Sequence, residues 1–190
     1  MFRFIALMLL TGFSLAQAAT IYNDRTNWTN ATVSAVINEP FDNNIASATM
    51  ITFDGGITAT GSGGQGTQNN QVASGQWQFR VYNPGGSNGY SSITVEFPAP
   101  VMAFGLDINS ISSSRGAKIS GDWDGNGEQI TDLWIHHGTT SNGFFGVVGS
   151  AAFTEFTIFA QGGTVVGDDF ITADDLSYED LDLIFADGFE

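Results

Sequence analysis

Apolar and polar residues alternate with a period of two along most of this chain. In the segment SSITVEF, Ile93, Val95 and Phe97 fall on one face. Thr94 and Glu96 fall on the opposite face. A period of two is that of a β-strand, whose successive side chains point to opposite sides of the sheet. The pattern therefore predicts strands that bury one face and expose the other.

Similar segments recur between clusters of Gly, Asn and Ser, which are typical turn residues. The segment VMAFGLDI alternates in the same way and places Asp107 opposite its apolar residues. Further strands are expected at residues 33–37, 56–60, 76–82, 117–123, 130–136, 144–148, 155–160 and 170–178. About ten strands with one short helix, at residues 24–31, predict an all-β fold, either an antiparallel sandwich or a barrel. Strands with one apolar and one polar face favour an antiparallel two-sheet β-sandwich.

The N-terminus has the three parts of a secretory signal peptide. Arg3 gives a positive start, residues 4–15 are mainly apolar, and Ala16-Gln17-Ala18 is a small-x-small cleavage site. The apolar part is shorter than the roughly 20 residues that span a bilayer, so we expect a secreted or periplasmic protein with no transmembrane segment in the mature chain. We expect a signal peptide at residues 1–18, a β-sandwich domain at residues 19–178 and an acidic tail at residues 179–190.

The charge of the chain is strongly unbalanced. Twenty Asp and Glu residues stand against five Lys and Arg residues, for a net charge of −15. Such a surface repels nucleic acid, which excludes that class of partner, and it attracts cations. Most carboxylates have no basic partner within the chain, so they are hydrated or some of them hold a metal ion. The chain has no Cys, which excludes disulfides, thiol nucleophiles and thiolate metal sites.

One acidic motif has the spacing of a calcium loop. Asp122, Asp124 and Asn126 are followed by Gly127, and D-x-D-x-N-G is how an EF-hand loop begins. The twelfth position, where a bidentate Glu is needed, is Leu133. The same residues also describe an acidic β-hairpin that turns at Asn-Gly. A calcium site and a plain hairpin therefore stay open as alternatives.

Candidates for ligand binding and catalysis are few. Most aromatic residues are expected in the core, but Trp123 lies beside carboxylates, where an exposed indole would stack on a sugar ring. The segment at residues 85–89 matches G-x-S-x-G, but a strand follows where the nucleophile elbow needs a helix. Paired carboxylates for polysaccharide hydrolysis remain an alternative in so acidic a chain.

Five segments resemble, in their order, the exported sandwich domains of bacterial PEP-CTERM-type proteins. They are TIYNDRTNW, NEPFDN, ITVEFPAPVMAFGLDI, GFFGVVGSAAFTEFTI and FITADDLSY. The sorting signal of that family, a Pro-Glu-Pro motif with a membrane helix and a basic end, has no counterpart in this sequence. Membrane anchoring therefore does not carry over.

The resemblance implies a jelly-roll-like sandwich similar to carbohydrate-binding modules. In such modules an acidic residue of the first strand and an Asp of the last strand share a structural calcium ion. By position, this implies calcium at Glu39, with Asp42, and at Asp174 or Asp175. The expectation is thus an exported, non-enzymatic module that is stabilised by calcium and binds a glycan or a matrix polymer. A polysaccharide hydrolase and a self-associating surface or matrix protein remain alternatives.

Overall fold

The computed structural model describes residues 18–33, 35–62, 70–83, 91–111, 117–133, 143–160 and 167–180. Its strands are β1 (Thr20–Tyr22), β2 (Val36–Glu39), β3 (Met50–Thr52), β4 (Thr58–Ser62), β5 (Gln71–Ala73), β6 (Gln76–Asn83), β7 (Ser92–Ile111), β8 (Ala117–Gly121), β9 (Gln129–Asp132), β10 (Gly143–Ala160) and β11 (Gly167–Asp180). They are joined by one α-helix, α1 (Arg25–Ala31), and one 3-10 turn, η1 (Asp54–Gly56). The expected all-β class is confirmed. Almost all of the predicted signal peptide, and the tail from residue 181, lie outside the described residues.

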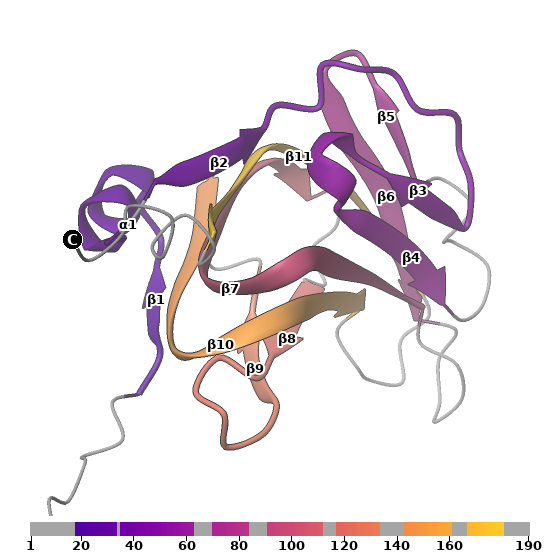
Figure 1. Ribbon diagram of the computed structural model, residues 1–190. Coiled ribbons are helices and arrows are strands. Elements are labelled where there is room, and N and C mark those ends of the chain that lie inside the picture. The colour runs from indigo at the N-terminus through magenta and orange to yellow at the C-terminus, as the bar shows by residue number, and fades with distance from the viewer. Residues whose placement is uncertain are drawn as a thin grey trace, which may run out of the picture.

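Two long strands, β7 and β10, build the layers of the fold. The first part of β7 pairs with β4 and with the end of β10, whereas its second part pairs with β11 and with the start of β10. The β7–β10 register shifts between Val148 and Phe153, which marks the corner at which β10 bends. Strands that pass from one sheet to the next through bulges are typical of sandwich corners. One continuous antiparallel sheet is thereby folded into two layers (Figure 1).

We name the layers after a strand that only one of them contains. The β4 layer runs β3–β4–β7–β10–β8–β9. The β11 layer runs β1–β10–β7–β11–β6–β5, with β2 also on β11. Strand β2 therefore pairs with the last strand, β11, as the calcium site implied by the resemblance requires, whereas β1 pairs with β10.

The core lies between the two layers and is strongly aromatic. Phe104 of the β11 layer stacks on Phe156 of the β4 layer, with ring centroids 4.3 Å apart and planes 3° apart. Phe97 and Tyr178 also meet across the layers, with ring centroids 5.3 Å apart and planes tilted by 43°. The predicted inward face of β7 is buried, and Asp107 lies on its outer face as expected. Aromatic pairs of this kind add about 0.5–1.5 kcal/mol each beyond the area that they bury.

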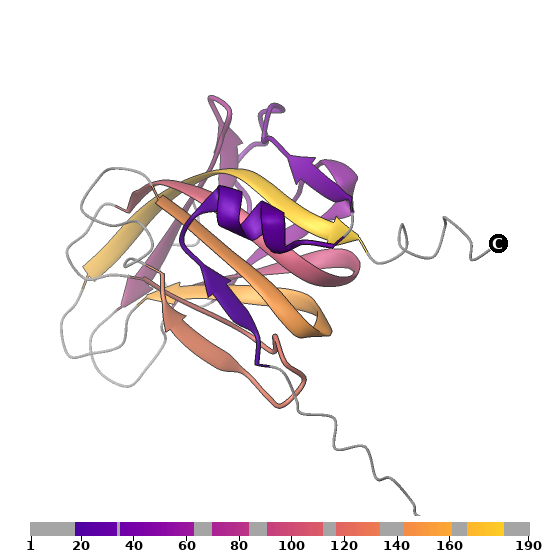
Figure 2. The ribbon, with the colours of Figure 1, turned by 90° about the vertical axis from the view of Figure 1, so that its left-hand side faces the viewer.

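Helix α1 covers the outer face of the β11 layer (Figure 2). Trp28 is 1% exposed, and its Nε1 donates to the carbonyl oxygen of Val147 at 3.0 Å. The indole lies flat on the sheet because Gly105 and Gly146, paired across β7 and β10, have no side chains. A Cβ at Gly105 would lie 2.5 Å from the ring of Phe144. The pair of glycines therefore fixes where α1 can sit.

The structure confirms the helix and shifts several strand boundaries. Asp24 is the N-cap of α1, and its Oδ1 accepts from the backbone N–H of Asn27 at 2.8 Å. The strands predicted separately on either side of residue 100, and those on either side of residue 150, are single strands, β7 and β10. Strand β11 continues to Asp180, so the first two residues of the predicted tail belong to the sheet. Within the described part of the chain, the helices fall short of the length and apolar character that a membrane span requires.

Candidate functional site

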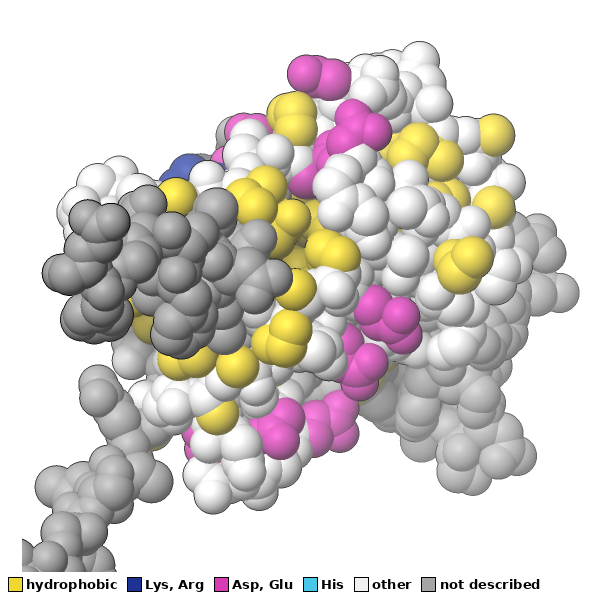
Figure 3. All heavy atoms as spheres, viewed as in Figure 1, with side chains coloured by type: hydrophobic (Ala, Val, Ile, Leu, Met, Phe, Trp, Pro, Cys, Tyr) yellow, Lys and Arg dark blue, Asp and Glu magenta, His cyan; other side chains and the backbone are white. Residues whose placement is uncertain are grey.

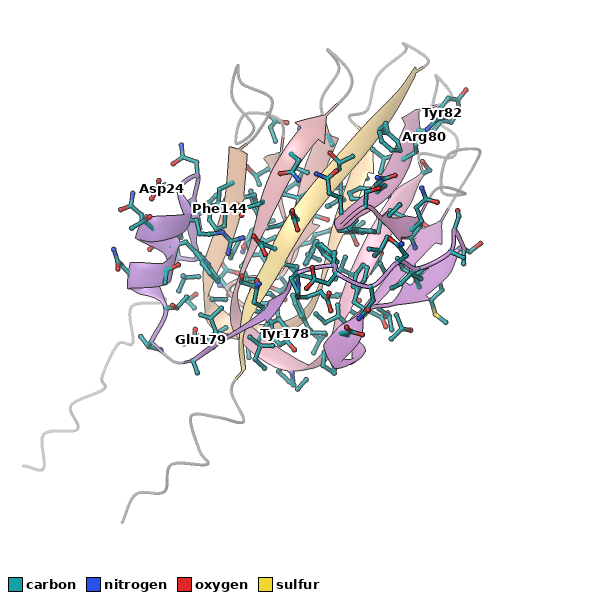
Figure 4. The ribbon with its side chains drawn as sticks, turned by 90° about the horizontal axis from the view of Figure 1, so that it is seen from above. Asp24, Arg80, Tyr82, Phe144, Tyr178 and Glu179 are labelled. Carbon is teal, nitrogen blue, oxygen red and sulfur yellow. The ribbon has the colours of Figure 1, made fainter. Side chains whose placement is uncertain are left out.

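A polar cavity of about 470 Å³ lies beside α1, on the outer face of the β11 layer. We call it the α1 pocket. Its lining residues are Asn23, Asp24, Arg25, Asp107, Asn109, Gly143, Phe144, Asp174 and Asp175. They come from four parts of the chain, and the β7–β11 register places Asp107 directly opposite Asp174. Figure 4 shows Asp24 and Phe144 at this end of the sheet, with Arg80 and Tyr82 at the other end.

Arg25 is the centre of this pocket. Its Nε donates to Asp107 Oδ2 at 3.0 Å, and its Nη1 donates to Ser177 Oγ at 2.8 Å. Its Nη2 donates to the backbone oxygen of Asp175 at 2.5 Å. The guanidinium also lies 4.9 Å from the ring centroid of Phe144, within cation–π range. One side chain of α1 thus holds β7 and β11 together at the point where their acidic residues meet.

The carboxyl groups of Asp107 and Asp174 are both held toward the protonated form. Burial raises the pKa of Asp107, and the hydrogen bond and charge of Arg25 offset only part of that rise. Burial likewise raises the pKa of Asp174, which the backbone N–H of Asp175 partly offsets. The negative charges of neighbouring carboxylates raise both pKa values further. Two adjacent carboxyls in a polar cavity are the arrangement in which one can donate and the other accept a proton.

A β-bulge shapes the β11 side of the pocket. Between the pairs Asp174–Asp107 and Ser177–Gly105, β11 has one more residue than β7. Asp175 lies within this bulge and has a φ of 45°. This left-handed conformation costs free energy for a residue other than Gly. Its backbone N–H donates to Asp174 Oδ1 at 2.9 Å. Bulges and strained residues of this kind are over-represented next to functional sites.

The structure separates the acidic residues that the resemblance placed in one calcium site. Glu39 on β2 is paired with Leu176 on β11, so its backbone is close to Asp174 and Asp175 as expected. The preceding residue, Asn38, donates from Nδ2 to Asp175 Oδ1 at 3.2 Å. Because neighbours in a strand point to opposite faces, the carboxylate of Glu39 lies on the other side of the sheet. The carboxylates of Glu39 and Asp175 are therefore not brought together.

Glu39 instead belongs to a second acidic group, which we call the Glu39 cluster: Glu39, Asp42 and Asp54. Glu39 is 4% exposed, and its Oε1 accepts from the backbone N–H of Phe41 at 2.9 Å. Its Oε2 is buried without a hydrogen-bond partner. The N–H of Asp54 faces the carboxylate closely enough to lower its pKa but does not reach hydrogen-bond geometry. Burial is the larger influence and raises the pKa, and the charges of Asp54 and Asp42 raise it further.

The motif predicted as half of a calcium loop connects β8 to β9. These strands are antiparallel neighbours, so the structure contains the β-hairpin that was the alternative to a calcium loop. Asp122 Oδ1 accepts from the N–H of Gly127 at 3.1 Å, and Asp124 Oδ1 accepts from that of Asn126 at 2.9 Å. The latter bond lowers the pKa of Asp124. Among the residues that the structure describes, no three acidic, His or Cys side chains are grouped so that they could hold a metal ion.

Trp123, the candidate for stacking on a sugar ring, lies in the core. The side chain is 1% exposed and packs edge-on against Phe153, with ring centroids 5.2 Å apart. Its backbone oxygen accepts from the N–H groups of Ser150 and Ala151, at 2.9 and 3.2 Å. The corner of β10 is thus tied to the backbone of Trp123, which directs the indole into the core. An indole in this position cannot stack on a ligand.

A second cavity of about 470 Å³, which we call the β10 groove, lies on the outer face of the β4 layer. Its lining residues are Pro100, Ser120, Gly121, Asp122, Glu128, Ala152, Phe153, Thr154, Glu155, Phe156 and Thr157. Glu128 and Glu155 are exposed, and Ser120 Oγ donates to Glu128 Oε1 at 2.6 Å. In Figure 3, acidic side chains form a broken band across this face, and the Lys or Arg atoms in view lie at the upper left of the picture.

Scans against protein-family models, curated proteins and solved structures each return no match to this chain. The candidate sites therefore depend on the geometry alone. Sequence reasoning missed Arg25, Asp107 and Asp54 as members of these sites. A usable indication existed for Asp107, which is the only charged residue of VMAFGLDI. Arg25 is one of only five basic residues, so its position in the expected helix was also informative.

Proposed function

We propose that this chain is an exported, non-enzymatic β-sandwich module that binds a glycan or matrix polymer and is stabilised by calcium. Export is supported by the signal-peptide pattern of the N-terminus. The resemblance to PEP-CTERM-type sandwich domains supports the same reading, since it implies a fold similar to carbohydrate-binding modules. The two-layer antiparallel fold is compatible with that class.

The observation that carries the binding function is the β10 groove. It combines carboxylates, hydroxyls and exposed apolar atoms of Pro100 and Ala152 in one cavity. Ligand sites typically combine a few convergent polar groups with an apolar lining. Carboxylates and hydroxyls are also the groups that pair with the hydroxyls of a sugar.

A glycan array tests this function. The mature chain is expected to bind at least one glycan class, and Glu128→Gln with Glu155→Gln is expected to abolish that binding. Asp107→Asn, at the other cavity, serves as the matched control and is expected to retain it. A blank array, or binding that is lost only with Asp107→Asn, contradicts a binding function at the groove.

The observation that favours calcium is the unpartnered Oε2 of Glu39. A buried carboxylate oxygen without a partner costs free energy, and a hard cation is one way to satisfy it. The charges of Asp42 and Asp54 act on Glu39, but the three side chains are not grouped as metal ligands. A calcium ion at Glu39 would therefore take most of its six to eight oxygen ligands from backbone carbonyls and water. At a calcium concentration about ten times Kd, binding would add about 1.4 kcal/mol to the free energy of unfolding.

Urea denaturation in calcium and in chelator tests this site. The wild type is expected to be more stable in calcium, and Glu39→Gln is expected to remove the difference, because Gln is neutral and isosteric. Asp122→Asn, in the β8–β9 loop, is the control and is expected to keep the calcium effect. Equal stability of the wild type with and without calcium would show that the metal part of the proposal is wrong.

A second candidate is a hydrolase that acts on polysaccharide through paired carboxyls. The α1 pocket favours it, because Asp107 and Asp174 face each other across two strands and burial raises the pKa of both. Turnover of generic polysaccharide substrates that is lost with Asp174→Asn, but kept with Glu155→Gln, would establish this reading. An absence of turnover over a range of pH favours the non-enzymatic module.

A further inference from the structure

The charge and hydrogen-bonding character of the β10 groove narrow the class of glycan that it accepts. We infer that the groove selects glycans that carry protonated amino groups, such as polymers of de-N-acetylated amino sugars. The inference rests on the proposed binding function and specifies the ligand of that same cavity. It is argued from four features of the groove: its charge, its donors and acceptors, its shape and its surroundings.

The described lining of the groove is negatively charged. Asp122, Glu128 and Glu155 line it, and no Lys or Arg is among the described residues of its lining. Glu96 adds to this charge, because β7 and β10 pair it directly with Glu155. Like charges in such a pair destabilise a sheet. A cationic ligand would relieve that repulsion, whereas a uronate or a sulfated sugar would increase it.

The nearest basic residue on β8 does not neutralise the groove. Lys118 Nζ lies 2.6 Å from Asp132 Oδ1 on the neighbouring strand β9, so it is already paired. Neither residue lines the cavity. The acidic residues of the groove are therefore available to an external cation.

The hydrogen-bonding groups of the groove are mainly acceptors. A carboxylate can only accept, and the Ser120 hydroxyl already donates its hydrogen bond to Glu128, which leaves the hydroxyls of Thr154 and Thr157 as side-chain donors. The ligand must therefore supply most of the donors. An ammonium group supplies three, and its charge-assisted bonds to a carboxylate are roughly twice as strong as bonds between neutral groups. Sugar hydroxyls supply the remaining donors.

A row of hydroxyls extends from the groove along the sheet, which favours a glycan over a basic peptide. The registers align Thr60, Thr94, Thr157 and Ser120 across β4, β7, β10 and β8. Thr94 Oγ1 and Thr157 Oγ1 lie 2.9 Å apart, so the row is an ordered array of hydroxyls. Such a surface pairs with the many hydroxyls of a sugar chain. A peptide, in contrast, would pair its backbone with a free strand edge, and the centre of this sheet has none.

The binding experiment compares two oligosaccharides of equal length by calorimetry at about pH 5.5, where sugar amines carry a proton. One is a glucosamine hexamer and the other is its N-acetylated form. The glucosamine hexamer is expected to bind at least about tenfold more tightly, the ratio that one additional charge-assisted bond of about 1.4 kcal/mol supplies. The affinity is expected to fall as salt is raised, because the groove is exposed.

Two variants with equal charge changes separate the groove from the acidity of the whole chain. Glu128→Gln with Glu155→Gln is expected to weaken binding of the glucosamine hexamer at least about tenfold. Asp182→Asn with Asp187→Asn removes the same charge elsewhere and is expected to change the affinity less than twofold. If both double variants lose affinity equally, the attraction is non-specific and the inference is wrong.

The remaining outcomes distinguish the inference from the proposed function. If the N-acetylated hexamer binds the groove as tightly as the amine form, selection by charge is wrong but glycan binding stands. If a lysine hexamer binds through the same two Glu residues as tightly as the glucosamine hexamer, the groove recognises a basic peptide and the inference is overturned. If neither oligosaccharide binds and the glycan array is also blank, the inference and the proposed function fail together.

Discussion

The α1 pocket and the β10 groove are cavities of similar volume, and both are rich in carboxylates. They differ in the presence of Arg25. In the α1 pocket the chain supplies its own cation, and this side chain is hydrogen bonded to β7 and to β11. In the β10 groove no basic residue is among the described residues of the lining. The same residue type therefore stabilises the fold in one cavity and is available to a ligand in the other.

This difference predicts opposite responses to substitution. Removing the cation from the α1 pocket leaves half-buried carboxyls without their partner, which is costly. Removing acids from the groove deletes exposed groups that repel one another, which costs little. Three experiments test the contrast, and the largest effect is expected for Arg25.

Arg25→Met is expected to lower the free energy of unfolding by about 2–3 kcal/mol, the range for losing hydrogen bonds to a charged group. Met keeps an apolar chain beside Phe144 but leaves Asp107 and Ser177 without their donor. Urea denaturation measures the change. Lys118→Met is the control, because it removes an ion pair of similar exposure, with Asp132, but not the further hydrogen bonds that Arg25 donates to Ser177 and to the backbone of Asp175. A partly exposed ion pair is worth at most about 1 kcal/mol. Equal losses in the two variants would show that Arg25 has no special structural role.

The contrast between the pockets could be predicted only in part from the sequence. Alternation placed Asp107 on the outer face of its strand, and the capping pattern located α1, because both depend on residues close together in the chain. The meeting of Arg25 with Asp107, which are 82 positions apart, depends on how the sheet folds over at its corners. No local pattern encodes that distance.

The predicted calcium residues show the same limit. Strands β2 and β11 are neighbours as expected, but the register of their pairing decides which face of the sheet each carboxylate lies on. A shift of one residue reverses every side chain of a strand. Glu39 therefore faces Asp54 and Asp42 and not Asp175, although their backbones are close. Trp123 was placed correctly in the hairpin loop, but the contacts of its backbone with the corner of β10 bury it.

The second experiment follows stability with pH, where a smaller effect is expected than for Arg25. Burial raises the pKa of Asp174 in the folded state above its value in the unfolded chain. The folded chain therefore binds more protons in the window between the two pKa values, and stability falls as pH rises through it. The window opens near pH 4, at about the ordinary Asp value, and extends upward to the raised pKa.

Asp174→Asn removes this group from the titration. The variant is expected to lose less stability than the wild type as pH rises through the window, because Asn stays neutral. Urea midpoints measured at intervals across the window provide the test. A wild-type slope in Asp174→Asn would mean that Asp174 is as solvated as the groove acids, which removes the contrast.

The smallest effect on stability is expected in the groove. Glu128→Gln with Glu155→Gln should change the free energy of unfolding by no more than about 0.5 kcal/mol, the usual range for exposed positions. The sign should be stabilising at low salt, because Glu155 no longer faces the charge of Glu96 across the strands. Added salt should then reduce the difference from the wild type, since screening removes the same repulsion.

Asp107→Asn, in the α1 pocket, is the variant with which the stability of the groove variant is compared. It removes one carboxylate that has an internal partner, so it should destabilise the chain, and salt should not restore the loss. A groove variant that destabilises the chain as much as Asp107→Asn would show that the fold depends on the groove acids by more than the hydrogen bond that Ser120 donates to Glu128. The groove would then be part of the architecture, and its carboxylates would not be available to a ligand.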